Sequence, residues 1–116
     1  MLAKNVEKQK NDELQAKLQD IKKQEGIIGF IIRGPETAAI DIKDPKKIIE
    51  YASLSSAAFE TSNDICKNVE IGKVNNLVVE SEDTKILCTT VNDQNISIFM
   101  EKTVNHDKLC KDLNSS

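Results

Sequence analysis

The side chains best suited to chemistry in this sequence are three cysteines and one histidine: Cys66, Cys88, Cys110 and His106. His106 lies four residues before Cys110, a spacing that places both on one face of a helix. The pair supplies two ligands, whereas zinc sites use at least three from the protein. A nucleophilic cysteine–histidine pair also needs a group that orients the base, and the sequence identifies none. We therefore predict that these residues are structural, with no metal site and no catalytic residue.

Phosphate-binding and acid–base motifs do not emerge from the pattern either. The four glycines, Gly26, Gly29, Gly34 and Gly72, do not form the Gly-x-x-x-x-Gly-Lys loop that cradles phosphates. The carboxylates are scattered over expected surfaces and turns, where solvation is their usual state. We predict that the protein is not an enzyme and that it binds no cofactor.

Charge and hydropathy limit the class of partner. Lysine and arginine total 16 against 19 aspartate and glutamate, a net charge of −3. Nucleic-acid-binding domains usually carry a net basic face, so we expect no nucleic-acid partner. No segment reaches the roughly 18 apolar residues that cross a membrane, and the first residues lack the apolar core of a signal peptide. An odd number of cysteines without Cys-x-x-Cys is typical of free thiols. We therefore expect a cytoplasmic protein without membrane insertion.

A chain of 116 residues accommodates one domain. Residues 1–25 are rich in helix formers, and Leu14, Leu18 and Ile21 recur at helical spacing. We predict a helix over about residues 7–24 that docks through its second half, ends before Gly26 and belongs to the same domain as residues 26–116. The alternative is a frayed tail.

The next two segments predict a hairpin. Residues 27–32 form an apolar run in which β-branched residues occupy both odd and even positions, so both faces of a strand would be apolar. This pattern indicates a strand that is buried on both faces, in the middle of a sheet. Turn residues follow at 33–36. Residues 37–42 then alternate, with Ala38, Ile40 and Ile42 on one face, so we expect a strand with one exposed face.

A long helix and three further strands complete the pattern. Asp44 followed by Pro45 is a strong helix start, and the helix is expected to continue to residue 69 or 70. Strands are predicted over 73–80, 85–91 and 96–102 with polar turns of four residues between them, followed by a short helix capped by Asn105. The order α-β-β-α-β-β-β-α predicts an α+β fold: a five-stranded antiparallel sheet with helices on both faces.

The long helix has one broad sheet-facing arc of apolar and small residues: Ile48, Tyr51, Ala52, Ser55, Ala58, Phe59, Ser62, Ile65, Cys66 and Val69. Ile49 and Leu54 lie outside this arc, and the opposite side is acidic. Two interpretations stay open. The helix is an ordinary amphipathic one with a solvated outer side, or it is buried twice, on its own sheet and on a partner.

In the order and spacing of these features, the sequence resembles the Roadblock family, the dynein-light-chain type, over about residues 10–113. The resemblance rests on Ile28-Gly29-Phe30, the turn Arg33-Gly34-Pro35-Glu36, the Ala- and Ser-rich helix 45–69, Ile71-Gly72 before Leu77-Val78-Val79-Glu80, and the last strand at 96–100. Residues 26–116 then correspond to a Roadblock-like domain, similar to prokaryotic and archaeal members.

This resemblance implies a non-enzymatic dimeric scaffold or adaptor that binds a small Ras-like GTPase through its long helix. Family members pair their third strands and lay their long helices together, which implies a homodimer interface at Val74, Leu77, Val79 and Ile49. The expected GTPase-binding surface is the outer side of the helix, with Glu50, Leu54, Ala57, Glu60, Thr61 and Asp64. The residues themselves favour self-pairing, because an aliphatic edge strand left unpaired is an aggregation hazard.

A second hypothesis is a small-ligand sensor of the related profilin-like or PAS/GAF-like architecture. Such sites are usually apolar or aromatic pockets with a few polar groups. The chain holds three phenylalanines, one tyrosine and no tryptophan, so the adaptor is the preferred hypothesis. Homodimer and heterodimer are not distinguished by the pattern alone.

Overall fold

The structure is a computed structural model that describes residues 2–34, 38–69, 76–91 and 93–114, with side chains at all of these except 2–11, 62–69 and 114. Its elements follow in the predicted order: α1 (Leu2–Lys22), β1 (Ile27–Arg33), β2 (Ala38–Ile42), a 3₁₀ turn (Pro45–Lys47), α2 (Ile48–Val69), β3 (Asn76–Glu80), β4 (Thr84–Val91), β5 (Gln94–Glu101) and α3 (His106–Asn114).

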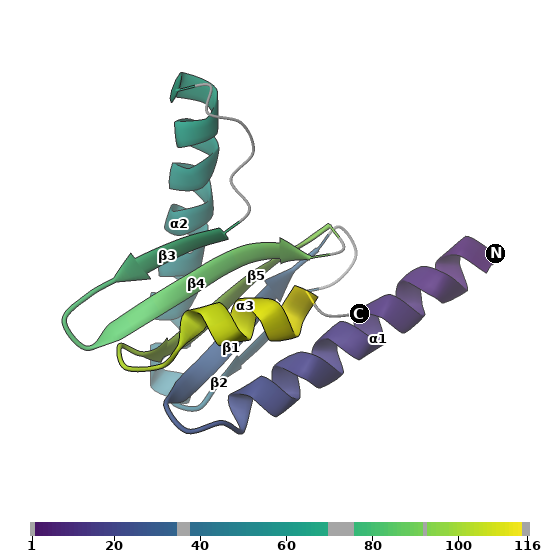
Figure 1. The fold of residues 1–116 in the computed structure, drawn as a ribbon, viewed down its shortest axis with the longest axis horizontal. Helices are drawn as coiled ribbons and strands as arrows, with labels where there is room; N and C mark the ends of the chain where they lie inside the picture. Colours follow the sequence, from purple (N-terminus) through teal and green to yellow (C-terminus); the bar gives the residue numbers. More distant parts are fainter. Residues whose placement is uncertain (1, 35–37, 70–75, 92, 115–116) are drawn as a thin grey trace.

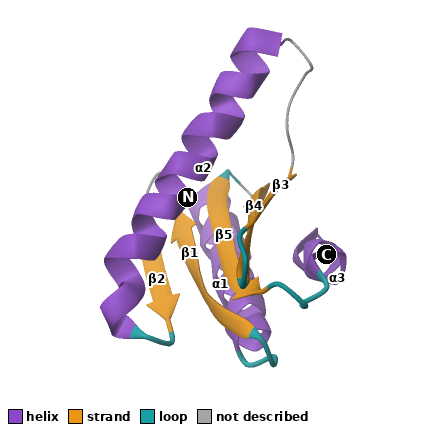
Figure 2. Cartoon of the chain, turned by 90° about the vertical axis from the view of Figure 1, so that its left-hand side faces the viewer, coloured by secondary structure: helices purple, strands orange, loops and turns teal. Residues whose placement is uncertain are grey.

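The strands form one five-stranded sheet in the order β2-β1-β5-β4-β3, with antiparallel neighbours throughout. Helix α2 covers one face of this sheet, and α1 and α3 cover the other (Figure 1; Figure 2). The predicted α+β fold with helices on both faces is therefore confirmed. The position of β1 between β2 and β5 also confirms the central strand that its two-phase apolar run predicted.

The α1 and α3 side of the sheet holds the larger apolar core. Leu14, Leu18 and Ile21 of α1 are buried there with Leu109 and Leu113 of α3. The helical spacing of the three α1 residues therefore predicted the docked stripe correctly. Because the stripe occupies the second half of α1, that half is anchored to the sheet, as expected.

The other core cluster lies between α2 and the sheet. Tyr51 packs against Phe99 of β5 with ring centroids 4.5 Å apart, and the buried Ser55 hydroxyl lies 2.6 Å from the Ser97 hydroxyl. This confirms the predicted sheet-facing arc from Ile48 to Phe59. Its other members lie outside the described side chains: Ser62, Ile65, Cys66 and Val69.

The two predicted helix-capping residues, Asp44 and Asn105, lie where the sequence placed them. The Asp44 carboxylate accepts from the Lys46 amide at the start of the 3₁₀ turn, and the Asn105 amide oxygen accepts from the Asp107 and Lys108 amides at the start of α3. Residues 70–75 lie outside the described residues, so only the part of the predicted strand from Asn76 onward is described.

The strand predictions need correction at both later turns and in β2. Three residues connect β3 to β4, and, because Val91 pairs with Gln94, two connect β4 to β5, where four were expected in each turn; β5 begins at Gln94. Asp93 takes a positive φ of 62° in this turn, which a short polar side chain tolerates better than most. In β2, Ile42 is buried but Ile40, on the same face, stays 45% exposed, because α2 does not fully cover this edge of the sheet.

The contact between α1 and β2 should make the free energy of unfolding depend on pH. Lys22 forms an ion pair and hydrogen bond with Asp41, and this interaction, helped by a hydrogen bond from Gln19 and opposed by desolvation, lowers the pKa of Asp41. A lowered native pKa stabilises the fold above the unfolded carboxyl pKa of about 3.9, and this contribution disappears as pH falls through the native pKa. Urea unfolding should therefore show a stability difference between wild type and Asp41→Asn at about pH 6 that shrinks toward about pH 2. The exposed Asp12→Asn on α1 is the control, and a difference that persists unchanged in acid would contradict the assignment.

Candidate functional site

Cys88, Cys110 and His106, whose side chains the structure describes, do not come together in one cluster, and the side chain of Cys66 lies outside the described residues. Cys88 is buried beneath α2, whereas His106 and Cys110 belong to α3 on the other face of the sheet. His106 Nδ1 lies 3.0 Å from Lys85 Nζ, and its Nε2 lies 3.6 Å from an Asp107 carboxylate oxygen. Burial raises the pKa of both described thiols, Cys88 and Cys110, which disfavours the reactive thiolate.

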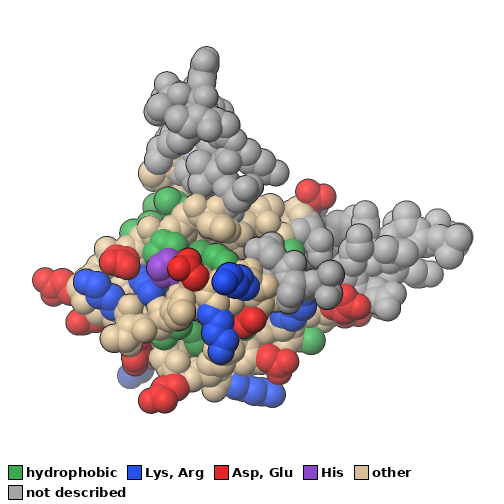
Figure 3. Space-filling model, in the orientation of Figure 1, with side chains coloured by type: hydrophobic (Ala, Val, Ile, Leu, Met, Phe, Trp, Pro, Cys, Tyr) green, Lys and Arg blue, Asp and Glu red, His purple; other side chains and the backbone are tan. Residues whose placement is uncertain are grey.

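Within the described part of the chain, no group of three or more histidine, cysteine, aspartate or glutamate side chains is placed to hold a metal ion. Over the face that carries α1 and α3, acidic and basic side chains are intermixed (Figure 3). Among the described helices, none is both long and apolar enough to cross a membrane.

The outer side of α2 is exposed along the part of the helix whose side chains the structure describes. Five of the six predicted partner-binding residues are exposed on it: Glu50, Leu54, Ala57, Glu60 and Thr61. The side chain of the sixth, Asp64, lies outside the described residues. The Thr61 hydroxyl donates to the Ala57 carbonyl at 2.9 Å, so this threonine is tied to its own helix.

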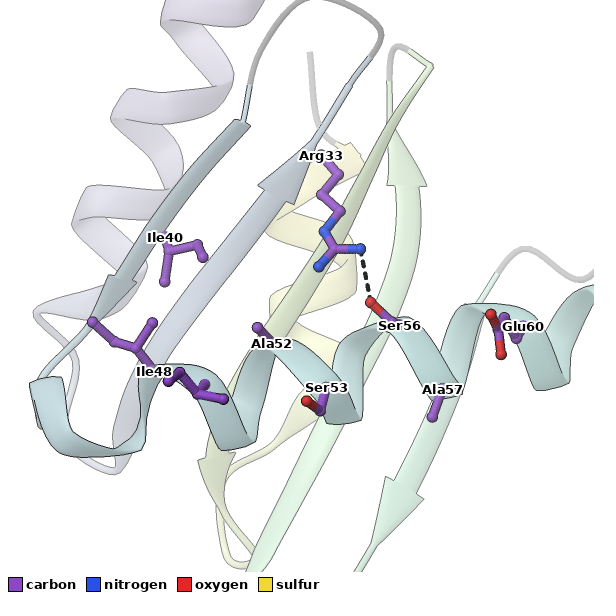
Figure 4. A pocket seen from close by; sticks show the side chains of 9 residues that line it. Arg33, Ile40, Ile48, Ala52, Ser53, Ser56, Ala57 and Glu60 are labelled. Atoms are coloured by element: carbon purple, nitrogen blue, oxygen red, sulfur yellow. Dashed lines mark hydrogen bonds between the residues drawn. The ribbon is translucent and has the colours of Figure 1, made fainter.

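An open groove runs between α2 and β2, with a volume of about 590 Å³. We call it the α2/β2 groove; its lining residues are Arg33, Ile40, Ile48, Ile49, Ala52, Ser53, Ser56, Ala57 and Glu60. Arg33 reaches across from the end of β1, and its guanidinium donates to the Ser56 hydroxyl at 2.7 Å (Figure 4). The groove therefore has an aliphatic end near Ile40 and a polar end near Arg33 and Glu60.

The groove divides the predicted partner surface. Ala57 and Glu60 line it, whereas Glu50, Leu54 and Thr61 do not. The sequence pattern did not indicate that Arg33, Ile40 or Ser56 belongs to any site. No local pattern could have found them, because the groove depends on how α2 packs across the edge of the sheet, which brings Arg33 to Ser56, 23 positions further along the chain.

The predicted dimer residues also separate into two places. Leu77 and Val79 lie on β3, at one edge of the sheet, with Leu77 half-buried against the α2 core and Val79 43% exposed. Ile49 is 82% exposed and lines the α2/β2 groove at the opposite edge. Val74 lies outside the described residues. Within one chain, Ile49 and the β3 residues therefore do not form one patch.

The C-terminal part of α2 extends past β3, beyond the edge of the sheet (Figure 1; Figure 2). The described strands therefore do not lie beneath this projecting part of α2. A helix usually rests its apolar face on another element.

Of the comparisons with known proteins, the one with solved structures supports the fold. No family model and no curated protein matches the sequence. Among solved structures, the chain is similar to a Roadblock/LC7 domain from Streptomyces avermitilis, with a TM-score of 0.63, 15% identity, and 88% of this chain and 87% of that chain covered. It is also similar to MglB of Myxococcus xanthus (TM-score 0.68, 9% identity, 88% and 89% covered) and to MglC of the same organism (0.53, 18%, 86% and 89%). The chain has a Roadblock-type fold.

Proposed function

We propose that this chain, with its Roadblock-type fold, is a non-enzymatic adaptor that forms a homodimer and binds a small Ras-like GTPase through the outer side of α2. The observation that carries the proposal is the long α2 helix, whose outer side is exposed while its C-terminal part projects beyond the sheet. The choice of a small Ras-like GTPase as the partner follows from the resemblance in sequence to the Roadblock family. The Roadblock-type fold of the chain is consistent with that resemblance.

The dimer would join the two β3 edges. β3 ends the sheet order, and Val79 on it is 43% exposed, so both its backbone edge and an aliphatic side chain lack cover from described residues. Pairing two copies of β3 about a two-fold axis satisfies the open backbone groups and removes the aggregation hazard of an aliphatic edge. It also continues the sheet beneath the projecting part of α2.

The GTPase surface would then be presented twice, once by each α2. Leu54, which is 42% exposed, and Ala57 supply apolar contact area, and Glu50 and Glu60 supply negative charge at its margin. Apolar residues at the centre of an interface usually provide most of the affinity, whereas charges at the rim chiefly steer association. A partner with basic residues around an apolar contact fits this surface.

The dimer predicts a change of mass in a strand-edge variant. Wild-type protein should sediment at about twice 12.9 kDa, and Val79→Lys should sediment near 12.9 kDa, because lysine on an edge strand opposes edge-to-edge pairing. The matched control is Ile40→Lys, whose parent side chain is 45% exposed on the opposite edge strand, and which should stay dimeric. If the wild type is monomeric, or if Ile40→Lys is monomeric while Val79→Lys stays dimeric, β3 is not the dimer interface.

Loss of GTPase capture tests the helix surface. Purified small Ras-like GTPases encoded in the same genome, loaded with GDP or with a non-hydrolysable GTP analogue, are titrated against wild type and against the double variant Leu54→Glu with Ala57→Arg. We expect the double variant to stay folded, since both positions are exposed, and to bind at least about thirtyfold more weakly, as substitution of central interface residues does.

The control for this titration changes charge on the other face of the sheet. Lys108→Glu, on the exposed side of α3, should bind as wild type does. Sedimentation of the double variant shows whether it is still a dimer. It therefore distinguishes weaker binding caused by a lost GTPase contact from weaker binding caused by dissociation of the dimer. Unchanged affinity in a folded, dimeric double variant would refute the proposed surface, and absence of binding by every GTPase would refute the partner class.

A further inference from the structure

The outer edge of β2 has backbone groups open for pairing. The Lys43 amide donates to the Ile28 carbonyl at 3.0 Å and so extends the β1–β2 register, in which Gly29 faces Ile42. Residues of an antiparallel pair alternate between hydrogen-bonded and non-hydrogen-bonded positions. Ala39 and Asp41 therefore bond to β1, whereas the N–H and C=O groups of Ile40, and of its neighbours two positions away, point outward.

Both faces of the sheet are hollowed beside this edge. The α2/β2 groove lies on one face, and a smaller hollow of about 160 Å³ lies on the α1 face, lined by Gln15, Gln19, Phe30, Ala39, Ile40 and Asp41. Ile40 contributes to both. Successive side chains of an extended chain point to opposite faces, so a strand laid beside β2 would place alternate side chains into the two hollows.

The two hollows differ in chemistry. On the α2 face, the nearest groups are aliphatic, with Ile40 45% and Ile49 82% exposed beside Ile48 and Ala52. On the α1 face, the amides of Gln15 and Gln19 supply polar groups. A strand that fits both therefore alternates aliphatic side chains with polar ones.

Charge disfavours a second copy of this chain as that strand. Exposed cations outnumber exposed carboxylates at the two ends of the open edge. Arg33, opposite Ala38 in the register, shares its end with Glu60, and Lys43, Lys46 and Lys47 share the other end with Asp44. None of the four cations makes an ion pair with a residue that the structure describes. Two β2 edges paired antiparallel would bring Arg33 of each copy toward the lysines of the other. An incoming strand with a carboxylate at each end is complementary instead.

We propose that the β2 edge and the α2/β2 groove bind an extended segment of a partner protein by strand addition, a segment in which aliphatic residues alternate with polar ones between flanking carboxylates. Backbone hydrogen bonds to Ile40 supply part of the affinity, and Ile40 and Ile49 contact the aliphatic side chains. This site is separate from the proposed β3 interface, since β2 and β3 are opposite edges of the sheet.

A synthetic peptide tests the proposal directly. Fluorescein-labelled Glu-Ile-Thr-Ile-Thr-Ile-Glu is titrated with the full chain and followed by fluorescence anisotropy. Ile40→Pro removes the outward N–H of residue 40 without removing a hydrogen bond to β1. Edge strands tolerate proline at such outward positions, so this variant should fold, but it should not bind the peptide. Ile40→Val, the matched control, should bind within about threefold of wild type, and Ile49→Ala about tenfold more weakly.

Two further readouts exclude other occupants. The lysine-flanked peptide Lys-Ile-Thr-Ile-Thr-Ile-Lys should bind about tenfold more weakly, and hydrogen exchange of the Ile40 amide should slow when the acidic peptide is bound. Equal binding by Ile40→Pro, or no binding of the acidic peptide up to its solubility limit, would overturn the proposal. A fall in the mass of the protein on Ile40→Pro would overturn it in favour of a second copy. Val79→Lys should leave peptide binding unchanged. Failure of the peptide-binding proposal can therefore be distinguished from failure of the proposed β3 dimer.

Discussion

Replacement of Gly29 by alanine is expected to lower the free energy of unfolding by more than about 3 kcal/mol, a large part of the roughly 5–15 kcal/mol that stabilises a domain. A Cβ at this position would lie 2.4 Å from the Asp41 carbonyl oxygen and 2.7 Å from the Ile42 Cα. Both are backbone atoms of the neighbouring strand, so neither can rotate away. The β1–β2 hairpin must therefore separate, and Ile42, buried against α2, loses its packing.

Urea unfolding of Gly29→Ala, followed by circular dichroism, measures this loss. The control is Ala38→Gly, which changes one methyl group at an exposed position of the same hairpin and should cost no more than about 1 kcal/mol. Equal stabilities of Gly29→Ala and wild type would mean that β1 and β2 do not approach as closely as described. Because β2 forms the edge proposed to bind a peptide, Gly29→Ala should also weaken that binding.

Truncation of Leu18 to alanine should cost about 2–5 kcal/mol. Leu18 is fully buried between α1 and the sheet, in the same cluster as Leu14 and Ile21. The substitution removes a buried side chain and leaves a cavity that α1 can close only by moving against β1. We propose that α1 forms one domain with residues 26–116, and we therefore expect one cooperative unfolding transition with a lower midpoint.

Gln15→Ala is the matched control, since Gln15 is an exposed residue of the same helix and alanine favours helix formation. It should unfold within about 0.5 kcal/mol of wild type. A loss below about 1 kcal/mol in Leu18→Ala, or a separate early transition of α1, would show instead that residues 1–25 are an appendage.

Much of the fold followed from patterns that span only a few residues. The spacing of Leu14, Leu18 and Ile21 placed the docked stripe of α1, and Asp44 marked the start of the segment that leads into α2. The two-phase apolar run of β1 indicated a central strand. These signals are reliable here because helical periodicity, capping and alternation are set by neighbours along the chain.

The sequence by itself determined the order of the elements, the sheet-facing side of α2 as far as Phe59, and the exposure of Leu54 and Glu60. Only the tertiary structure decided how these surfaces combine. It placed Ile49 beside Ile40 and far from β3, and it brought Arg33 to Ser56 to form the α2/β2 groove. The physical reason is that the angle at which a helix crosses a sheet depends on the packing of all their side chains together, and no short segment encodes that angle.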